Sequence, residues 1–228
     1  MLSVVIPSLN AAARLPMCLE ALVAPAVSGL VTEVIVVDGG SQDASMAIAD
    51  GFGAKVLTAP PGRGGQLKKG AEAARGAWLL FLHADTVLEA GWADEARGFI
   101  SGDDARAGVF TLAFDASGFA PRLIRAGAMA RTRIFKMPYG DQGLLVSRAL
   151  YDAVGGYSDM PLFEDVDIIR RIIAHENRAA LHIFKSKAVT DAARYQRRGY
   201  FRQAVTNLWR LMRYHAGVAP EQLAKSYR

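Results

Sequence analysis

The chain has 228 residues, of which 51% are hydrophobic, and carries a net charge of +5. This length is enough for one sizeable core and short for two full domains, and a single cysteine, Cys18, excludes a disulfide framework. No apolar run approaches the ~18 residues that a membrane-crossing helix needs, and no signal-peptide pattern precedes the first strand, so we expect a cytoplasmic protein. The charge favours anionic partners, such as nucleotide phosphates, lipid head groups or nucleic acid, without choosing among them.

Short β-rich runs alternate with helical patterns in the first 86 residues. The predicted strands cover residues 3–7, 33–38, 54–59 and 77–85. The amphipathic helices predicted between them lie around residues 15–22, 46–49 and 66–75. Near-continuous Val/Ile runs are typical of strands covered on both faces, so this order predicts a doubly wound, mostly parallel α/β sheet.

The pattern becomes more irregular after Thr86. The predicted elements are, in chain order, a helix over 92–100, a strand over 107–114, a helix over 121–135, a strand over 143–147, a helix that begins at Glu164, a strand over 180–184 and a helix over 199–215. We therefore predict a single domain over 1–228, with a nucleotide-binding half (1–86), an acceptor and catalytic half (87–198) and a C-terminal helical extension (199–228).

Polar residues follow each of the first four predicted strands. Ligands bind at the carboxyl ends of the strands in an open parallel sheet, so these residues are candidates for binding. They are Pro7, Ser8 and Asn10 after the first strand, Asp38, Gly39, Gly40, Ser41 and Asp43 after the second, Arg63 after the third, and His83 and Asp85 after the fourth. Structural roles, such as a glycine turn with Ser41 as a helix cap, are equally compatible with the pattern.

Three motifs bear on chemistry. The segment "GRGGQLKKG" is suited to phosphate at a helix N-terminus or to a solvated loop, but it is neither a P-loop nor a dinucleotide fingerprint. His83 and Asp85, two positions apart, face one side of an extended chain. Glu164, Asp165 and Asp167 stand in a first helical turn, where the helix dipole alone also favours acids.

The ordered set "SVVIPSLN", "VIVVDGGSQDAS", the basic glycine-rich segment, a strand that ends in an acidic triplet, and "FEDVD" resembles the family-2 glycosyltransferases of GT-A fold. Within them, "GRGGQLKKGAEAARGAWLLFLHADT", "YGDQGLLVSR" and the arginine-rich tail resemble the bacterial radical-SAM/selenodomain-associated subgroup. The resemblance covers the chain from about Ser3 to about Tyr214. It implies sugar transfer from a nucleotide-diphosphate donor to a hydroxyl with inversion at the anomeric centre, and no nucleic acid partner.

The resemblance also implies roles for individual residues. Asp85 matches the last acid of the Asp-X-Asp metal motif, and Asp165 matches the acceptor-activating base, with Glu164 beside it. The residues implied to bind the donor nucleotide are Pro7, Ser8, Asn10, Asp38, Gly40, Arg63, His83, Arg194, Arg197 and Arg198. Those implied to face the donor sugar or the acceptor are Asp141 and Gln142.

The chain departs from the family pattern at His83, which stands where the first aspartate of Asp-X-Asp would be. An imidazole is able to hydrogen-bond ribose or to bind a metal, but it adds no negative charge. We predict a divalent cation, Mn²⁺ or Mg²⁺, and a neutral imidazole ligand favours Mn²⁺. Whether His83 faces metal or ribose stays open.

The segment "RRGYFRQAVTNLWRLMRYHAG" predicts an amphipathic helix. Its apolar stripe comprises Phe201, Val205, Leu208, Trp209 and Met212, and the arginines at its flanks and rear are Arg198, Arg202, Arg210 and Arg213. Such a helix is suited to the inner membrane surface, where it would bring the site to a lipid-linked acceptor. Docking on the protein's own core, or on a partner subunit of a homo-oligomer, is the other interpretation.

Two other classes of function stay open. A sugar nucleotidyltransferase would share the fold and the metal, but it would carry a glycine-rich, basic segment right after the first strand, where this chain has "SLNAAARLP". A non-catalytic module that binds nucleotide or anionic lipid is favoured by His83 if the metal site is lost. Glu164 and Asp165 argue against that loss.

Overall fold

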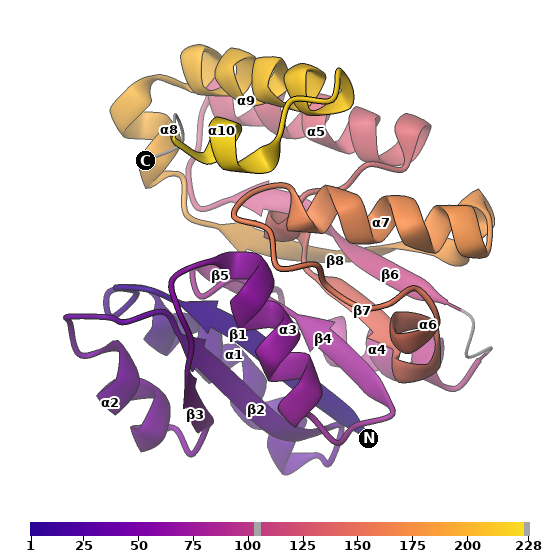
Figure 1. Cartoon of the computed structure of the whole chain (residues 1–228). Coiled ribbons are helices and arrows are strands. Elements are labelled where there is room, and N and C mark those ends of the chain that lie inside the picture. The colour runs from indigo at the N-terminus through magenta and orange to yellow at the C-terminus, as the bar shows by residue number, and fades with distance from the viewer. Residues whose placement is uncertain (103–105, 226–228) are drawn as a thin grey trace.

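A mixed sheet of eight strands runs through the computed structural model, which describes residues 1–102 and 106–225 (Figure 1). The strand order is β3-β2-β1-β4-β7-β6-β8-β5. The strands are β1 (Leu2–Ser8), β2 (Val31–Asp38), β3 (Lys55–Thr58), β4 (Trp78–Phe81), β5 (Thr86–Leu88), β6 (Ala107–Phe114), β7 (Leu144–Ser147) and β8 (Leu181–Thr190).

The first four strands are parallel neighbours, so their carboxyl ends share one edge of the sheet. β7 joins them antiparallel to β4, β6 pairs antiparallel with β7 and parallel with β8, and β5 closes the far edge antiparallel to β8. The predicted α/β class is confirmed. The antiparallel pairs extend the sheet beyond the four parallel strands β1–β4.

Helices cover both faces of this sheet. They are α1 (Leu15–Val27), α2 (Ser45–Gly51), α3 (Arg63–Ala73), α4 (Trp92–Ile100), α5 (Phe119–Phe135), α6 (Arg148–Ala153), α7 (Glu164–His175), α8 (Ala193–Arg198), α9 (Tyr200–His215) and α10 (Pro220–Lys225), with 3₁₀ turns η1 (Gly140–Gln142) and η2 (Arg178–Ala180). One core cluster packs α1 and α4 on the sheet and includes Cys18, which is 1% exposed, as its role as a small apolar residue requires. A second cluster packs α3, α6 and α7 on the other face.

Two predicted strands have different ends in the structure. The strand predicted over 77–85 ends at Phe81, because the chain turns there and the Thr86 N–H donates to the His83 carbonyl at 3.1 Å. Leu82, the next residue, is buried in the core, and its N–H still donates to the Val5 carbonyl of β1 at 3.1 Å. The strand predicted over 180–184 continues to Thr190, since β6 and β5 both pair with it. β5, α6, α8 and α10 were not predicted.

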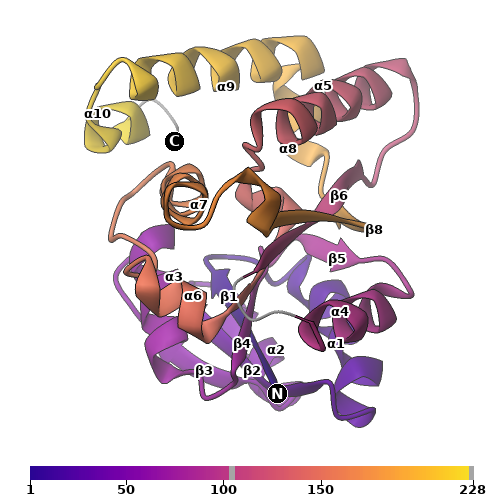
Figure 2. The same cartoon turned by 90° about the vertical axis from the view of Figure 1, so that its right-hand side faces the viewer.

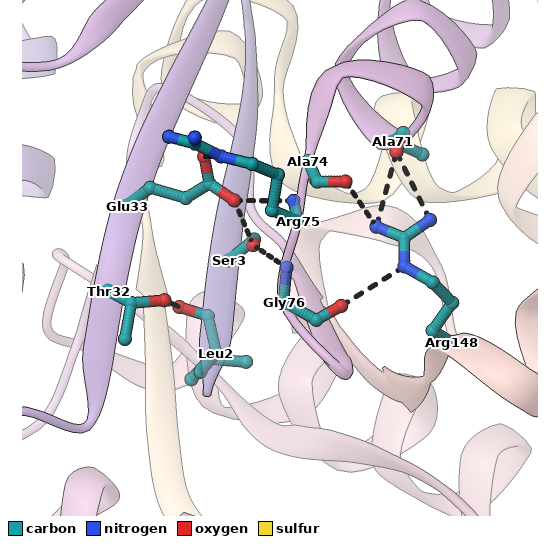
Figure 3. A network of polar contacts seen from close by, with 9 residues as sticks. All are labelled: Leu2, Ser3, Thr32, Glu33, Ala71, Ala74, Arg75, Gly76 and Arg148. Atoms are coloured by element: carbon teal, nitrogen blue, oxygen red, sulfur yellow. Dashed lines mark hydrogen bonds and ion pairs between the residues drawn. The ribbon is translucent and has the colours of Figure 1, made fainter.

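A polar clamp fastens the connection between α3 and β4, at the end of the strands away from the polar loops (Figure 3). The Arg148 guanidinium donates to the carbonyls of Ala71, Ala74 and Gly76, the shortest contact being 2.8 Å to Ala74. Ser3 joins the same network, because its hydroxyl accepts from the Gly76 N–H at 2.8 Å and donates to Glu33 at 2.6 Å. Arg148 thereby caps the carbonyls at the C-terminal end of α3.

A layer of helices lies at the end of the molecule remote from β2 and β3 (Figures 1 and 2). It contains α5, α9 and α10, and α9 docks on the loop before α7 through a small cluster. The members of that cluster are Leu162, Phe163, Val166, Leu211 and Leu223. Among the residues described, no helix is both long and apolar enough to cross a bilayer.

Candidate active site

The loops after β1 and β2 hold one another in place. Asn10 has a left-handed φ of 50°, and its backbone N–H donates to Ser41 Oγ at 2.8 Å. The Asn10 side-chain oxygen accepts from the Gln42 N–H at 2.8 Å. Asn10 and Ser41 are 31 residues apart in sequence, and this reciprocal pair of hydrogen bonds joins the loops after β1 and β2. The shape of this edge is therefore fixed by contacts within the protein.

Asp38 is buried, and its carboxylate is used within its own turn. Oδ2 accepts from the N–H groups of Gly40 and Ser41, both at 2.8 Å, and Oδ1 accepts from the Ser41 hydroxyl at 2.5 Å. Gly40 has a φ of 94°, a conformation that glycine adopts without strain. Neither Asp38 nor Gly40 lines the neighbouring pocket, so their contact with a nucleotide stays a prediction.

A pocket, here called the β1 pocket, lies beside these loops. It brings together six predicted site residues, five of them predicted to bind the donor nucleotide and Asp85 predicted to bind the metal, and Leu162 and Asp191 also line it. The six are Pro7, Ser8, Asn10, Arg63, His83 and Asp85. Residues from separate strand ends therefore converge as the parallel topology predicts.

A second pocket, here called the α7 pocket, continues from the first. The two share Arg63, His83, Asp85, Leu162 and Asp191. The remaining polar residues of the α7 pocket come mainly from the η1 turn and helices α7, α8 and α9, and they include Asp141, Glu164, Asp165, Arg194, Gln203, Asn207 and Arg210. The predicted catalytic acids and the predicted donor residues thus face one continuous space.

Asp165 is held by the backbone of η1. Its Oδ2 accepts from the Gly140 N–H at 2.6 Å, and Asp165 stands in the first turn of α7. Gly140 fits closely between two functional side chains: a Cβ placed there would lie 2.6 Å from His83 Nε2 and 3.4 Å from Asp165 Oδ2. The positions of His83 and Asp165 therefore depend on the absence of a side chain at residue 140.

Glu164, beside Asp165, is 2% exposed. Burial, and then the charge of Asp165, raise the pKa of Glu164 to about 7. The Arg63 guanidinium lies 3.9 Å from its carboxylate and opposes this shift. At neutral pH Glu164 is protonated in a large fraction of molecules, so the two neighbouring acids do not carry two full charges.

Asp141 is the third acid of the α7 pocket. Burial raises the pKa of its carboxyl to about 6, with Arg131 opposing and Asp165 adding to the shift. The Asp141 Oδ1 atom is buried and has no hydrogen-bond partner among the described residues. Because a buried acceptor without a partner is costly, this oxygen is well placed to accept from a ligand hydroxyl in the pocket.

His83 and Asp85 flank a tight turn instead of standing on the extended strand that the sequence predicted. Burial, and secondarily Arg63, hold the pKa of His83 well below its usual range, so its imidazole is neutral at pH 7. Asp85 is exposed to the pockets, yet their walls displace bulk water and raise the pKa of its carboxyl. The Asp191 charge adds to this rise, and Arg63 opposes it.

Asp191 belongs to the site and was missed in the sequence. It follows the end of β8, lines both pockets and forms an ion pair with Arg14 at 2.9 Å. The signal was a strand followed by an acid, as at Asp38, but the strand predicted over 180–184 stopped too early to show it.

A cation at this site would need a bound substrate to complete its coordination. Among the described residues, no three His, Cys, Asp or Glu side chains are grouped to hold a metal. Asp85, with Asp191 close enough to raise its pKa, supplies the one or two carboxylates that Mg²⁺ or Mn²⁺ uses when substrate phosphates complete its coordination. The residues present therefore fit a cation that binds together with a diphosphate.

The three predicted phosphate-binding arginines lie on α8. Arg194, Arg197 and Arg198 line a groove together with Asp85 and Asp191. Arg194 also lines the α7 pocket. The structure thus brings these arginines to the point where the two pockets meet.

The inner face of α9 contributes a set of polar residues that the sequence did not single out. Gln203 and Arg210 are 2% and 4% exposed, and both line the α7 pocket with Asn207. Arg210 was expected at the flank or rear of the helix. The spacing i, i+4, i+7 of these three residues was the available signal, but the apolar stripe obscured it.

Gln142 is the one predicted sugar-binding or acceptor-binding residue that the structure keeps out of both pockets. Its side chain is fully buried, accepts from the Thr132 hydroxyl at 2.7 Å and donates to the Phe110 carbonyl at 2.9 Å. These bonds tie α5 and β6 to η1. Gln142 positions the turn that carries Gly140 and Asp141.

Comparison with known proteins gives one consistent class. The family model described as "Glycosyl transferase family 2" matches residues 3–158. A PGL/p-HBAD biosynthesis glycosyltransferase of Mycobacterium tuberculosis is 30% identical over 167 residues, which are 69% of this chain and 63% of the relative. The dolichyl-phosphate beta-glucosyltransferase of Drosophila melanogaster is 36% identical over 99 residues, 37% of this chain and 30% of the relative. The chain therefore spans less than two thirds of the length of these relatives.

Solved structures give the same fold. Glucosyl-3-phosphoglycerate synthase from Mycobacterium tuberculosis, in complex with Mn²⁺ and UDP-glucose, superposes with a TM-score of 0.64. The match has 20% sequence identity and covers 83% of this chain and 70% of the synthase. At this identity the likeness concerns the fold.

Proposed function

This chain belongs to glycosyl transferase family 2, and from that membership and the geometry of the two pockets we propose that it transfers a sugar from a nucleoside diphosphate donor to an acceptor hydroxyl. The nucleotide lies in the β1 pocket, and the sugar and the acceptor meet in the α7 pocket. The observation that carries this proposal is the Asp165 carboxylate, held by the Gly140 N–H at 2.6 Å in a pocket continuous with the donor residues.

Asp165 acts as the general base. A neutral hydroxyl is a weak nucleophile, and a positioned carboxylate that removes its proton as the new bond forms contributes ~10²- to 10⁴-fold in rate. The Gly140 N–H occupies Oδ2 and orients the carboxylate. Attack from the side opposite the leaving diphosphate inverts the anomeric centre in a single displacement.

Glu164 supports Asp165 without replacing it. Its side chain is almost fully buried, and its pKa of about 7 leaves it partly protonated at neutral pH beside Asp165. Partial protonation of Glu164 reduces the negative charge that stands beside the Asp165 carboxylate.

The leaving diphosphate develops negative charge next to a basic wall. Arg63, Arg194, Arg197 and Arg198 line the groove and the pocket walls around Asp85. Fixed cations that face the place where charge develops stabilise the transition state more than the ground state.

We assign the divalent cation to Asp85, with Asp191 as the second carboxylate. When bound, Mn²⁺ or Mg²⁺ neutralises part of the charge on the diphosphate. The neutral His83 lies against Gly140, whose N–H holds Asp165. We therefore propose that His83 contacts the bound donor, and that Asp85 carries the metal role.

The first donors to test are UDP-sugars. Glucosyl-3-phosphoglycerate synthase, which shares the fold, was solved with UDP-glucose and Mn²⁺. A panel of UDP-, GDP- and dTDP-sugars, each measured with Mn²⁺, Mg²⁺ or chelator, will identify the donor by thermal stabilisation. The cytoplasmic location and a lipid-linked acceptor remain predictions from the sequence.

Replacement of Asp165 by Asn tests the proposal directly. The variant keeps the Gly140 contact but loses the base, so kcat should fall by ~10²-fold or more while the affinity for the donor stays within about twofold. The matched control is Asp152→Asn, which removes an exposed acid of α6. Unchanged kcat in Asp165→Asn would remove this residue as the base, and donor binding in the absence of any transfer activity would favour a non-catalytic binding module.

A further inference from the structure

The positive charge of the chain is concentrated in two segments, residues 119–135 and 193–215, here called the arginine cap. They contain α5, α8 and α9, with ten arginines and no Asp or Glu. The rest of the chain has 17 Lys and Arg against 22 Asp and Glu, which is a net charge of −5. The overall charge of +5 therefore describes an acidic body with a strongly basic cap.

The outer face of this cap is also apolar. Phe119 is 78% exposed, Ile134 63% and Val205 67%. The other large apolar side chains exposed on α5 and α9 are Leu123, Phe135, Phe201, Leu208, Trp209 and Met212. The apolar stripe predicted for the C-terminal helix does not dock on the described core of the chain.

Both helices already have a separate inner face. α9 buries Leu211, Gln203 and Arg210, and α5 buries Met129 and Thr132. Figures 1 and 2 show the two helices in the same layer, and residues of α5 and α9 are in contact. The exposed apolar residues therefore lie on the outward side of helices whose inward side already packs against the rest of the protein.

We infer that the outer face of the arginine cap docks on an anionic lipid bilayer. An interfacial helix combines a large apolar face with arginines whose long side chains reach the head groups. The Arg213 guanidinium lies 4.6 Å from the centre of the Trp209 ring, so an aromatic side chain and a cation lie together at the surface. Anionic lipid attracts each nearby arginine, and the exposed Phe, Trp and Leu side chains are suited to the acyl boundary.

The positive charge of the cap favours docking on an anionic bilayer over docking on a second copy of this chain. A symmetric dimer through the outer face would bring the exposed arginines of one cap, among them Arg125, Arg133 and Arg202, against those of another. Asn207 and Arg210 line the α7 pocket from the opposite face of α9. Docking would therefore place that pocket about one helix diameter, ~10 Å, from the lipid surface.

Trp209 provides a site-specific readout. Trp78 and Trp92 are 3% and 2% exposed in the core, whereas Trp209 is 49% exposed on the cap. Vesicles of phosphatidylcholine with phosphatidylglycerol at about a third of the lipid should shift its emission to the blue and protect it from acrylamide. Pure phosphatidylcholine vesicles should bind ~10-fold more weakly, and the difference should shrink as salt rises.

Two sets of variants separate charge from apolar contact. Arg125→Gln, Arg133→Gln and Arg202→Gln combined, or Phe201→Ser, Val205→Ser and Leu208→Ser combined, should each weaken sedimentation with anionic vesicles by ~10-fold or more. The matched controls at exposed sites outside the cap are Arg75→Gln, Arg178→Gln and Lys185→Gln, and Met46→Ser, Phe52→Ser and Val27→Ser. Each control set should change binding less than about twofold. Circular dichroism and melting curves confirm that each variant is folded.

Three results would overturn the inference. One is equal binding to neutral and anionic vesicles, or no binding to either. Another is an equal loss of binding in the cap variants and their matched controls, which would show that the contact is not specific to the cap. The third is a concentration-dependent dimer, detected by sedimentation velocity, that the apolar cap variant abolishes, because the cap would then be a protein interface. None of these results bears on sugar transfer, which the Asp165→Asn experiment tests.

Discussion

At the scale of single residues, the site depends on groups whose surroundings change their ordinary chemistry. The pocket walls shield the half-buried His83 imidazole from bulk water and, together with the nearby Arg63, lower its pKa. Burial of the Glu164 carboxyl beside Asp165 raises its pKa to about 7. Asp165 keeps an ordered carboxylate through the Gly140 N–H. The α7 pocket therefore offers one oriented carboxylate, with a partly protonated Glu164 beside it.

The pH dependence of the free energy of unfolding should reveal the raised pKa of Glu164. Its pKa is about 7 in the folded state, against an ordinary value of 4.5, so the folded protein binds the proton more tightly than the unfolded chain. The wild-type free energy of unfolding should fall, relative to that of Glu164→Gln, as pH rises from 4.5 through about 7. Urea unfolding at a series of pH values across this range measures the difference. Glu20→Gln, at an exposed position of α1, is the control, and a pH-independent difference for Glu164→Gln would contradict the assignment.

Gly140→Ala tests the spacing between His83 and Asp165. The added Cβ would stand 2.6 Å from His83 Nε2, so either the imidazole or the η1 turn must move. A displacement of about 1 Å at a reacting group costs ~10²-fold in kcat, while the fold remains. The control is Gly98→Ala in α4, where nothing lies within 4 Å; it should stabilise the protein by about 0.5–1 kcal/mol and leave kcat unchanged. Equal kcat in Gly140→Ala and the wild type would show that this spacing is not important.

At the scale of elements, the loops of the active edge depend on clamps at the other end of the strands. Arg148, the first residue of α6, holds carbonyls at the C-terminal end of α3, and α3 begins with Arg63 at the pockets. At the N-terminal end of α3, Gly64 packs closely against the backbone at Ser158, since a Cβ there would lie 2.3 Å from the Ser158 carbonyl oxygen. The helix is therefore fixed at both ends.

Arg148→Ala should lower the free energy of unfolding by about 2–3 kcal/mol, because it leaves the carbonyls of Ala71, Ala74 and Gly76 without their charged donor. Arg75→Ala is the matched control from the same network (Figure 3). Its side chain is 87% exposed and pairs with Glu33 at 3.8 Å, so the change should cost at most about 1 kcal/mol. Urea denaturation measures both, and equal values would contradict the clamp.

At the scale of the whole molecule, the pockets lie between the parallel half of the sheet and the helices added after it. Asp85 and Arg63 come from the first half, and Asp165, Asp191 and Arg194 come from the second. A ligand that contacts both halves binds only when they are assembled. Ligand binding should therefore stabilise the complete fold.

UDP with Mn²⁺, each at about 100 times its dissociation constant, should stabilise the protein by ~2.7 kcal/mol, which corresponds to ~5–10 °C in Tm. Removal of Mn²⁺ by chelator should abolish most of this shift. Asp85→Asn should behave like the chelated wild type, and Asp94→Asn, whose side chain is 86% exposed on α4, like the wild type with Mn²⁺. A shift that is the same with and without Mn²⁺ would remove the metal role of Asp85.

The sequence by itself determined the α/β class, most of the elements and the convergence of Pro7, Ser8, Asn10, Arg63, His83 and Asp85. Side-chain periodicity is a local property, and strands that alternate with helices pair in parallel, so that their carboxyl ends share one edge. Only the tertiary structure decided which face of each element packs against the rest of the protein. Leu82 is buried in the core just past the end of β4, and α9 buries Arg210 while it exposes Trp209. Periodicity defines the two faces of a helix, but the neighbours that pack against it decide which one is the inside. The place of Asp191 in the site was also decided by the tertiary structure. Asp191 follows the end of β8, and the length of β8 depends on its pairing with β5 and β6.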